Sequence, residues 1–244
     1  MAAFLRDFTK EELDEVFPDP AVREVSFEIR FPPRLRVNAE LWKLQDRLVE
    51  QYPNVSTESV FVQPGGGVLS LSVFQNPVTG RCIKVSQENF IVAFTKYTRF
   101  EDFKDEVAHK TGVFCDTFGV TSLLRVGLRY VNNIELPAAA STGLLLKYVR
   151  PLTDFERVDI ENVDQFLNEV RLRHFNHLVT LRGVLLPPLQ DGRRIYVLDI
   201  DCHSFAQHTQ EDISALLDRY HDSAQEFFLD HITDEYKNVM RGQS

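Results

Sequence analysis

The sequence predicts an α+β protein built from two tandem β-α-β-β-β-α units, each with an antiparallel sheet and helices packed on one face. Three observations support this prediction. Several segments alternate apolar and polar residues, which is typical of half-buried strands. Other segments repeat apolar residues at helical spacing, and the order of the segments occurs twice along the chain. Two such sheets side by side would form a saddle or helix-grip shape, which serves many unrelated functions.

An N-terminal helix and linker are expected at residues 1–21. Thr9 and Glu12 form a capping-box pattern, which predicts that a short helix begins there and runs to about Phe17. Pro18 and Pro20 then end this helix.

The first β-α-β-β-β-α unit is expected at residues 22–118. Its predicted elements are a strand at 22–31, a helix at 40–52, strands at 68–74, 81–86 and 89–96, and a helix at 100–118. The glycine-rich run at 64–67 leads into a strand and contains no lysine. We therefore interpret it as a plain connection and not as a phosphate-binding loop.

The second unit is expected at residues 119–244. Its predicted elements are a strand at 123–136, a short helix at 143–150, strands at 167–175, 177–186 and 193–203, and a long helix at 211–240. The strand at 167–175 is chosen over a helix because the first unit has a strand at the equivalent place. Phe227, Phe228 and Ile232 are expected to be buried on the last helix.

Composition and charge narrow the classes of function. The formal net charge of −9 opposes non-specific attraction to nucleic acid, whereas an acidic surface suits a basic protein partner. No apolar run approaches the roughly 20 residues of a membrane-spanning helix, and the acidic N-terminus lacks the features of a secretion signal. Three widely spaced cysteines are typical of reduced thiols. We expect a cytoplasmic protein without membrane contact.

Four blocks in order carry a family resemblance. They are FPDPAVREVSFEIRF, LLRVGLRYVNNI, YVLDIDCHSF and FFLDHITDEYKNVMRG. In these blocks, which span nearly the whole chain, the sequence resembles an uncharacterised, sporadically distributed bacterial protein family. The resemblance implies no activity and no site residue. Patchy distribution is common among accessory genes, such as those of defence or toxin–antitoxin systems.

Two rows of charged residues are the candidate sites. Arg125 and Arg129 share one face of the strand at 123–136, and Arg182 lies in another strand of the same half. Such a row could clamp a phosphate, a carboxylate or a partner. The favoured interpretation is instead that Arg125 or Arg129 forms an ion pair with Asp199 or Asp201, because half-buried charges need partners.

A metal site is the second candidate. Asp199, Asp201 and His203 alternate on one face of a strand and are ligand types that bind divalent metals. Successive residues on one strand face lie about 6–7 Å apart, however, and three of them rarely converge on one ion. The favoured interpretation is therefore a solvent-facing or ion-paired row.

No catalytic motif is found, and no cofactor is expected: the chain has no nucleophile elbow, HExxH, Walker loop or CxxC. The sequence therefore favours a non-enzymatic binding protein with a protein partner or a homo-oligomer. The main alternative is a nucleic-acid or nucleotide binder that uses Arg125, Arg129 and Arg182. A metal-dependent hydrolase that uses Asp199, Asp201 and His203 is the second alternative.

Overall fold

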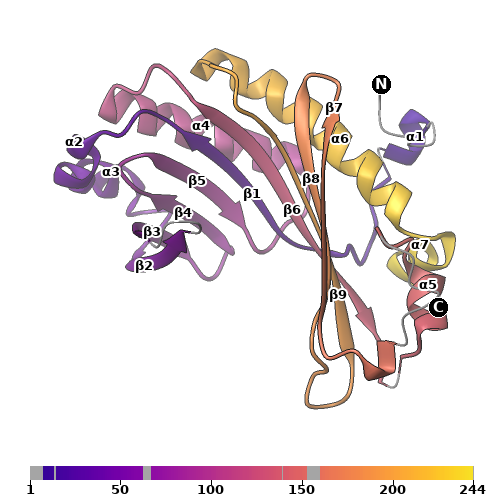
Figure 1. The fold of residues 1–244 in the computed structure, drawn as a ribbon. Helices are drawn as coiled ribbons and strands as arrows, with labels where there is room; N and C mark the ends of the chain where they lie inside the picture. The colour runs from indigo at the N-terminus through magenta and orange to yellow at the C-terminus, as the bar shows by residue number, and fades with distance from the viewer. Residues whose placement is uncertain (1–7, 14, 63–66, 139, 153–159, 244) are drawn as a thin grey trace. The chain divides into compact units, whose positions relative to one another are not determined.

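The structure, a computed structural model, describes residues 8–13, 15–62, 67–138, 140–152 and 160–243 (Figure 1). Within these residues it contains nine strands and seven α-helices, so the predicted α+β class is confirmed. None of the described helices is both long enough and apolar enough to cross a membrane.

The strands cover most of the segments that alternate in the sequence. They are β1 (Val22–Arg30), β2 (Asn54–Val62), β3 (Gly67–Asn76), β4 (Arg81–Val85), β5 (Asn89–Phe94), β6 (Arg125–Leu136), β7 (Phe166–His174), β8 (His177–Leu185) and β9 (Arg194–Ser204). The helices are α1 (Lys10–Leu13), α2 (Leu35–Ala39), α3 (Leu41–Leu48), α4 (Phe100–Phe118), α5 (Thr142–Tyr148), α6 (Ile213–His231) and α7 (Asp234–Met240). Two short 3₁₀ turns are η1 (Ile160–Asn162) and η2 (Gln210–Asp212).

The strands form one antiparallel sheet in the order β2-β3-β4-β5-β1-β6-β9-β8-β7. The prediction of two identical β-α-β-β-β-α units is wrong in one respect, because the first half has four strands after its helices. The additional strand, β2, was not predicted because its residues 54–59 are all exposed and therefore do not alternate in polarity. If β2 is left out, the strands from the middle of the sheet to its edge follow the order β1-β5-β4-β3 in the first half of the chain. In the second half they follow the order β6-β9-β8-β7. An internal duplication and a saddle or helix-grip shape stay predictions.

Contacts divide the chain into two compact units that interleave along the sequence. Unit 1 consists of residues 1–23, 129–202 and 220–244, and unit 2 of residues 24–128 and 203–219. The predicted boundary at residue 118 separates two units by the order of their secondary-structure elements, and it stays a prediction. The division by contacts is a different one.

The core of unit 2 lies between helix α4 and the strands β1 and β5. Phe114 of α4 stacks on Phe90 of β5 with ring centroids 4.4 Å apart, and Phe103 meets Phe94 edge to face at 5.1 Å. The helix ends as predicted, because Gly119 adopts a left-handed conformation with φ of 65° that a residue with a Cβ adopts only at a cost. Large aromatic rings thus fix α4 on one face of the sheet, where Figure 1 shows it alongside these strands.

The predicted single helix at 211–240 is wrong, because the helix ends at His231 and a new one begins at Asp234. Ile232 forms a β-bridge with Val149, and the Thr233 hydroxyl caps α7 by accepting a hydrogen bond from the Tyr236 N–H at 3.3 Å. The burial predicted for Phe227, Phe228 and Ile232 is nevertheless confirmed. The helix α6 therefore still carries an apolar face into the core of unit 1.

Two predictions at the N-terminal side have different outcomes. The capping box of α1 is confirmed, since the Glu12 N–H donates to the Thr9 hydroxyl at 3.2 Å and the Thr9 N–H donates to the Glu12 carboxylate at 3.0 Å. The helix is shorter than predicted and ends at Leu13. Most of the predicted glycine-rich connection, residues 64–66, lies outside the described residues.

Candidate functional site

The ion pair predicted between the charged rows is confirmed. Arg129 lies on β6 with the buried Leu128 and Tyr130 on the opposite face, so its side chain projects from the other face. Its guanidinium donates through Nε to Asp199 Oδ1 at 2.7 Å and through Nη2 to Oδ2 at 2.9 Å. Asp199 of β9 is only 4% exposed, so this two-bond contact satisfies a nearly buried carboxylate.

Asp199 has a second arginine partner, which extends the pair into a network over β6, β9, β8 and β7. Arg182 Nη1 donates to Asp199 Oδ2 at 3.1 Å, and Arg182 Nε donates to Glu169 Oε2 at 2.6 Å. Glu169 also pairs with Arg171 at 3.1 Å. Burial opposes the charge on Arg182, but the hydrogen bonds to Glu169 and Asp199 outweigh it and raise the pKa of Arg182. The network therefore holds three arginines against two carboxylates.

Arg125 belongs to unit 2 and has a different partner. Its guanidinium donates to Glu28 of β1, whose carboxylate also accepts from Arg30 at 3.0 Å. The guanidinium of Arg125 lies directly over Gly127, where a Cβ would overlap with it. Each arginine of the predicted anion-binding row thus has a carboxylate partner.

The predicted metal trio of Asp199, Asp201 and His203 is not assembled. Within the part of the chain that the structure describes, no group of three or more His, Cys, Asp or Glu side chains could hold a metal ion. The reason is that Asp199 is occupied by two arginines, while same-face neighbours on a strand diverge. The ring of His203 instead meets the Phe205 ring edge to face, with centroids 5.3 Å apart.

Burial dominates the electrostatic surroundings of the three thiols, although Lys84 partly offsets it at Cys82. Burial raises the pKa of Cys82 and the pKa of Cys115 to about 11, and it also raises the pKa of Cys202. A catalytic thiol needs a lowered pKa near a cation or a helix N-terminus. These thiols therefore remain protonated near neutral pH.

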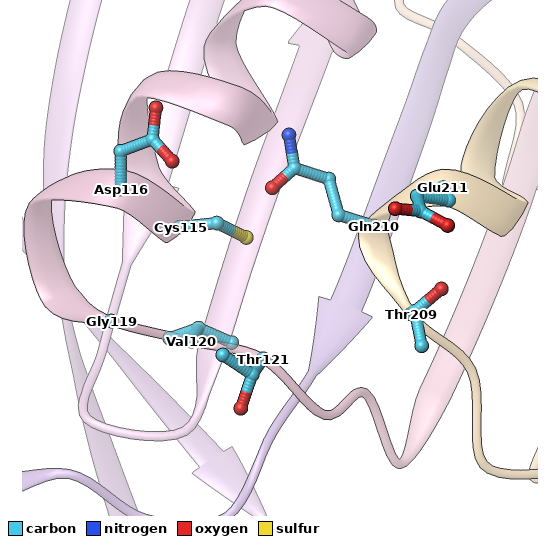
Figure 2. A pocket seen from close by; sticks show the side chains of 8 residues that line it. All are labelled: Cys115, Asp116, Gly119, Val120, Thr121, Thr209, Gln210 and Glu211. Atoms are coloured by element: carbon cyan, nitrogen blue, oxygen red, sulfur yellow. The ribbon is translucent and has the colours of Figure 1, made fainter.

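A cavity that sequence reasoning missed lies in unit 2, between the end of α4 and the turn η2. It has a volume of about 660 Å³ and is lined by Cys115, Asp116, Gly119, Val120, Thr121, Thr209, Gln210 and Glu211. Figure 2 shows the Cys115 and Gln210 side chains pointing toward each other across this space. The two acidic side chains and the C-terminal end of α4 make the surroundings negative. Burial raises the pKa of the Cys115 thiol in this cavity, which opposes its ionisation.

Strand β7 of the β7–β8 hairpin is largely exposed, whereas β8 is mostly buried. None of the β7 side chains before His174 is buried, and the apolar Leu167 and Val170 are 62% and 37% exposed. A two-residue turn, Phe175–Asn176, joins the strands, because His174 pairs with His177. Phe175 is 68% exposed and has a φ of 49°, the only positive φ among the described non-glycine residues.

Two buried histidines fix the base of this turn on helix α6. His174 Nε2 lies 3.1 Å from the Glu226 carboxylate, and its ring packs edge to face on Phe227 at 5.2 Å. The His177 ring packs on Tyr220 at 5.0 Å. Phe175 therefore projects from a rigid support. The sequence prediction placed Phe175 inside the strand, although Asn176 next to it is a turn residue that could have indicated its position.

Comparisons with known proteins add no family to this description. No protein-family model matches the chain, and no curated protein matches it. The resemblance to a sporadically distributed bacterial family therefore stays a prediction.

Proposed function

We propose that this chain is a non-enzymatic protein-binding component that contacts its partner through the β7–β8 hairpin. The observation that carries the proposal is Phe175, a large aromatic residue that is exposed and held at positive φ. For a residue with a Cβ, this conformation costs about 1–2 kcal/mol. Strained residues of this kind concentrate at functional sites. Aromatic side chains are also the commonest anchors in protein interfaces.

The neighbouring side chains support a contact surface for protein. Leu167 and Val170, on opposite faces of β7, and Phe175 in the turn expose apolar groups over both faces and the end of the hairpin, beside the charged Glu169 and Arg171. Exposed apolar residues that occur singly need no explanation, but a group of them with a charged rim is typical of an interface.

The other candidate functions have less support. Arg125, Arg129 and Arg182 have carboxylate partners, and the net charge is −9, so a nucleic-acid or nucleotide binder is disfavoured. The resemblance to a sporadically distributed family favours a cytoplasmic role in a bacterial accessory system of the defence or toxin–antitoxin type. In such a role the chain acts by contact and not by catalysis.

The test removes the aromatic ring and the strain together. In Phe175→Gly, relief of the positive φ opposes the backbone entropy of glycine, so the thermal midpoint should stay constant or rise slightly. Proteins captured from a native bacterial lysate by tagged wild type should be lost with this variant, as measured by quantitative mass spectrometry. Phe205→Gly is the matched control, because Phe205 is equally exposed but lies in unit 2. Capture that survives Phe175→Gly unchanged would contradict the proposal.

A further inference from the structure

Strand β7 forms one end of the nine-stranded sheet and pairs only with β8 within the described sheet. The residues that flank a two-residue turn exchange their backbone hydrogen bonds, so His174 and every second residue before it bond to β8. The alternate residues Leu167, Glu169, Arg171 and Arg173 therefore direct their N–H and C=O groups to the outer edge. In the described part of the chain, none of these groups has a backbone partner outside the β7–β8 pair.

The side chains at these four positions restrict which strand could pair with the edge. Charged residues on an edge strand normally prevent indiscriminate pairing. Here one acid, Glu169, is followed two and four residues later by the bases Arg171 and Arg173. In an antiparallel pair, residues directly opposite each other interact, and opposite charges there are stabilising. A strand with the same sequence, running in the opposite direction, can therefore place an acid opposite a base twice.

Among the central registers, the crossing at Val170 achieves this for a second copy of the chain without placing like charges opposite each other. When the two strands cross at Val170, Glu169 faces Arg171 of the second copy, and the reciprocal contact forms by symmetry. A crossing at Arg171 also brings Glu169 opposite Arg173, but it places two arginines opposite each other. A crossing at Glu169 places two glutamates opposite each other. With the crossing at Val170, the residues whose backbone N–H and C=O groups point to the free edge lie opposite the same kind of residue in the second copy. Backbone donors therefore meet backbone acceptors across the pair.

Two further features agree with this register. Val170 is the midpoint of Phe166–His174, so all nine residues of each strand overlap. The exposed Leu167 would face Arg173 of the second copy, whose aliphatic stem can cover it. We propose that β7 pairs antiparallel with β7 of a second copy, with the two Val170 side chains meeting on the two-fold axis. This inference rests on the proposed function only in taking the β7–β8 hairpin as a contact surface.

Cysteine cross-linking tests the register. The two Val170 residues form a non-hydrogen-bonded pair with Cα atoms about 4.5 Å apart, which is within disulfide reach. Val170→Cys should therefore form a disulfide-linked dimer on a non-reducing gel. Leu172→Cys lies on the same face but about 14 Å from its counterpart, and it should stay monomeric under the same oxidant. Wild-type protein treated with the same oxidant is the control for disulfides formed by the natural Cys82, Cys115 and Cys202. Equal cross-linking of both variants, or none of Val170→Cys, would overturn the proposal.

Charge reversal tests the ionic contacts in the uncross-linked protein. Arg171→Glu replaces two attractive contacts by two repulsive ones, and the dimer Kd measured by sedimentation should rise about tenfold. Arg173→Glu is the matched control, since it reverses the same charge on the same edge but faces Leu167 and should change the Kd far less. Equal weakening by both variants, or a wild type that stays monomeric at millimolar concentration, would overturn the pairing. A protein partner lost only with Phe175→Gly would still support the proposed function.

Discussion

Asp199 shows how a single residue decides whether an arginine row is a binding site or a structural feature. It is nearly buried and accepts hydrogen bonds from Arg129 and Arg182, which come from two different strands. A buried carboxylate without partners would be unstable, and so would two adjacent arginines without a carboxylate between them. The three side chains therefore stabilise one another, and the guanidinium groups of both arginines are already engaged by a carboxylate.

A double-mutant cycle on Arg129 and Asp199 measures this mutual stabilisation. Asp199→Ala should lower the free energy of unfolding by about 3 kcal/mol, because it removes the carboxylate from two arginines at once. Arg129→Ala should cost less, since Arg182 still neutralises Asp199. We expect a coupling energy of about 1–2 kcal/mol from urea denaturation.

The exposed pair Arg99–Asp102 provides the control for this cycle. Its side chains are about half exposed or more and lie within one helical turn, so the same cycle should yield less than about 0.5 kcal/mol. Equal coupling in both pairs would mean that burial of Asp199 contributes nothing to the interaction.

At the scale of elements, sequence reasoning succeeded where periodicity was strong and failed where packing decided. The helix α4 was predicted with both ends correct from its apolar spacing, and its C-terminal end agrees with the left-handed Gly119 that follows it. The strand β2 was missed because exposed residues on both faces leave no alternation. The break before α7 was missed because Ile232 and Tyr236 continue the apolar pattern, whereas the bridge from Ile232 to Val149 depends on tertiary structure.

In the candidate site, too, local sequence predicted some contacts, and tertiary structure decided the others. The need of the charged rows for partners predicted the contact between Arg129 and Asp199. Arg125 pairs with Glu28 because β1 lies beside β6 in the sheet. The order of strands in the sheet cannot be inferred from the local sequence around Arg125. The exposed position of Phe175 depends on a turn one residue earlier than predicted.

Replacement of glycine by alanine in a strand and in a helix shows how packing overrides the conformational preference of the residue. Gly183 in β8 lies against the hydroxyl of the buried Tyr196, and a Cβ there would overlap with it. Gly183→Ala should therefore lower the free energy of unfolding by about 1–3 kcal/mol. At Gly143 in α5 a Cβ would make only an ordinary contact, with Ser141 Oγ at 3.8 Å, so Gly143→Ala should stabilise the helix by about 0.5–1 kcal/mol.

Thermal unfolding of the two glycine variants provides the measurement. Opposite shifts of the thermal midpoint are expected, with Gly183→Ala below wild type and Gly143→Ala above it. If both variants raised the midpoint, the Tyr196 ring would have to move at little cost, and the close packing of β8 against it would not be a constraint.

At the scale of the whole molecule, the interleaved composition of the two units determines which fragments can fold. Unit 2 needs residues 203–219 as well as 24–128. Within it, Leu123 and His208 exchange backbone hydrogen bonds at 3.0 and 3.1 Å, and Lys104 pairs with Asp218 at 2.6 Å. The first part of α6 also contributes the buried Leu217 to unit 2. A chain cut at residue 118 lacks all of these contacts.

We therefore expect that a fragment of residues 22–118 does not fold cooperatively, although the order of elements marks it as a unit. Removing residues 203–219 exposes the side of α4 that packs on η2, where Gln210 lies close to Gly112, and this loss of buried surface is large for a small domain. Near-ultraviolet circular dichroism and amide dispersion in NMR spectra provide the measurement. As the control, residues 24–128 joined to 203–219 by a flexible linker should recover a cooperative transition. A cooperative transition in the fragment 22–118 alone would show that the division by element order, and not the division by contacts, describes the folding units.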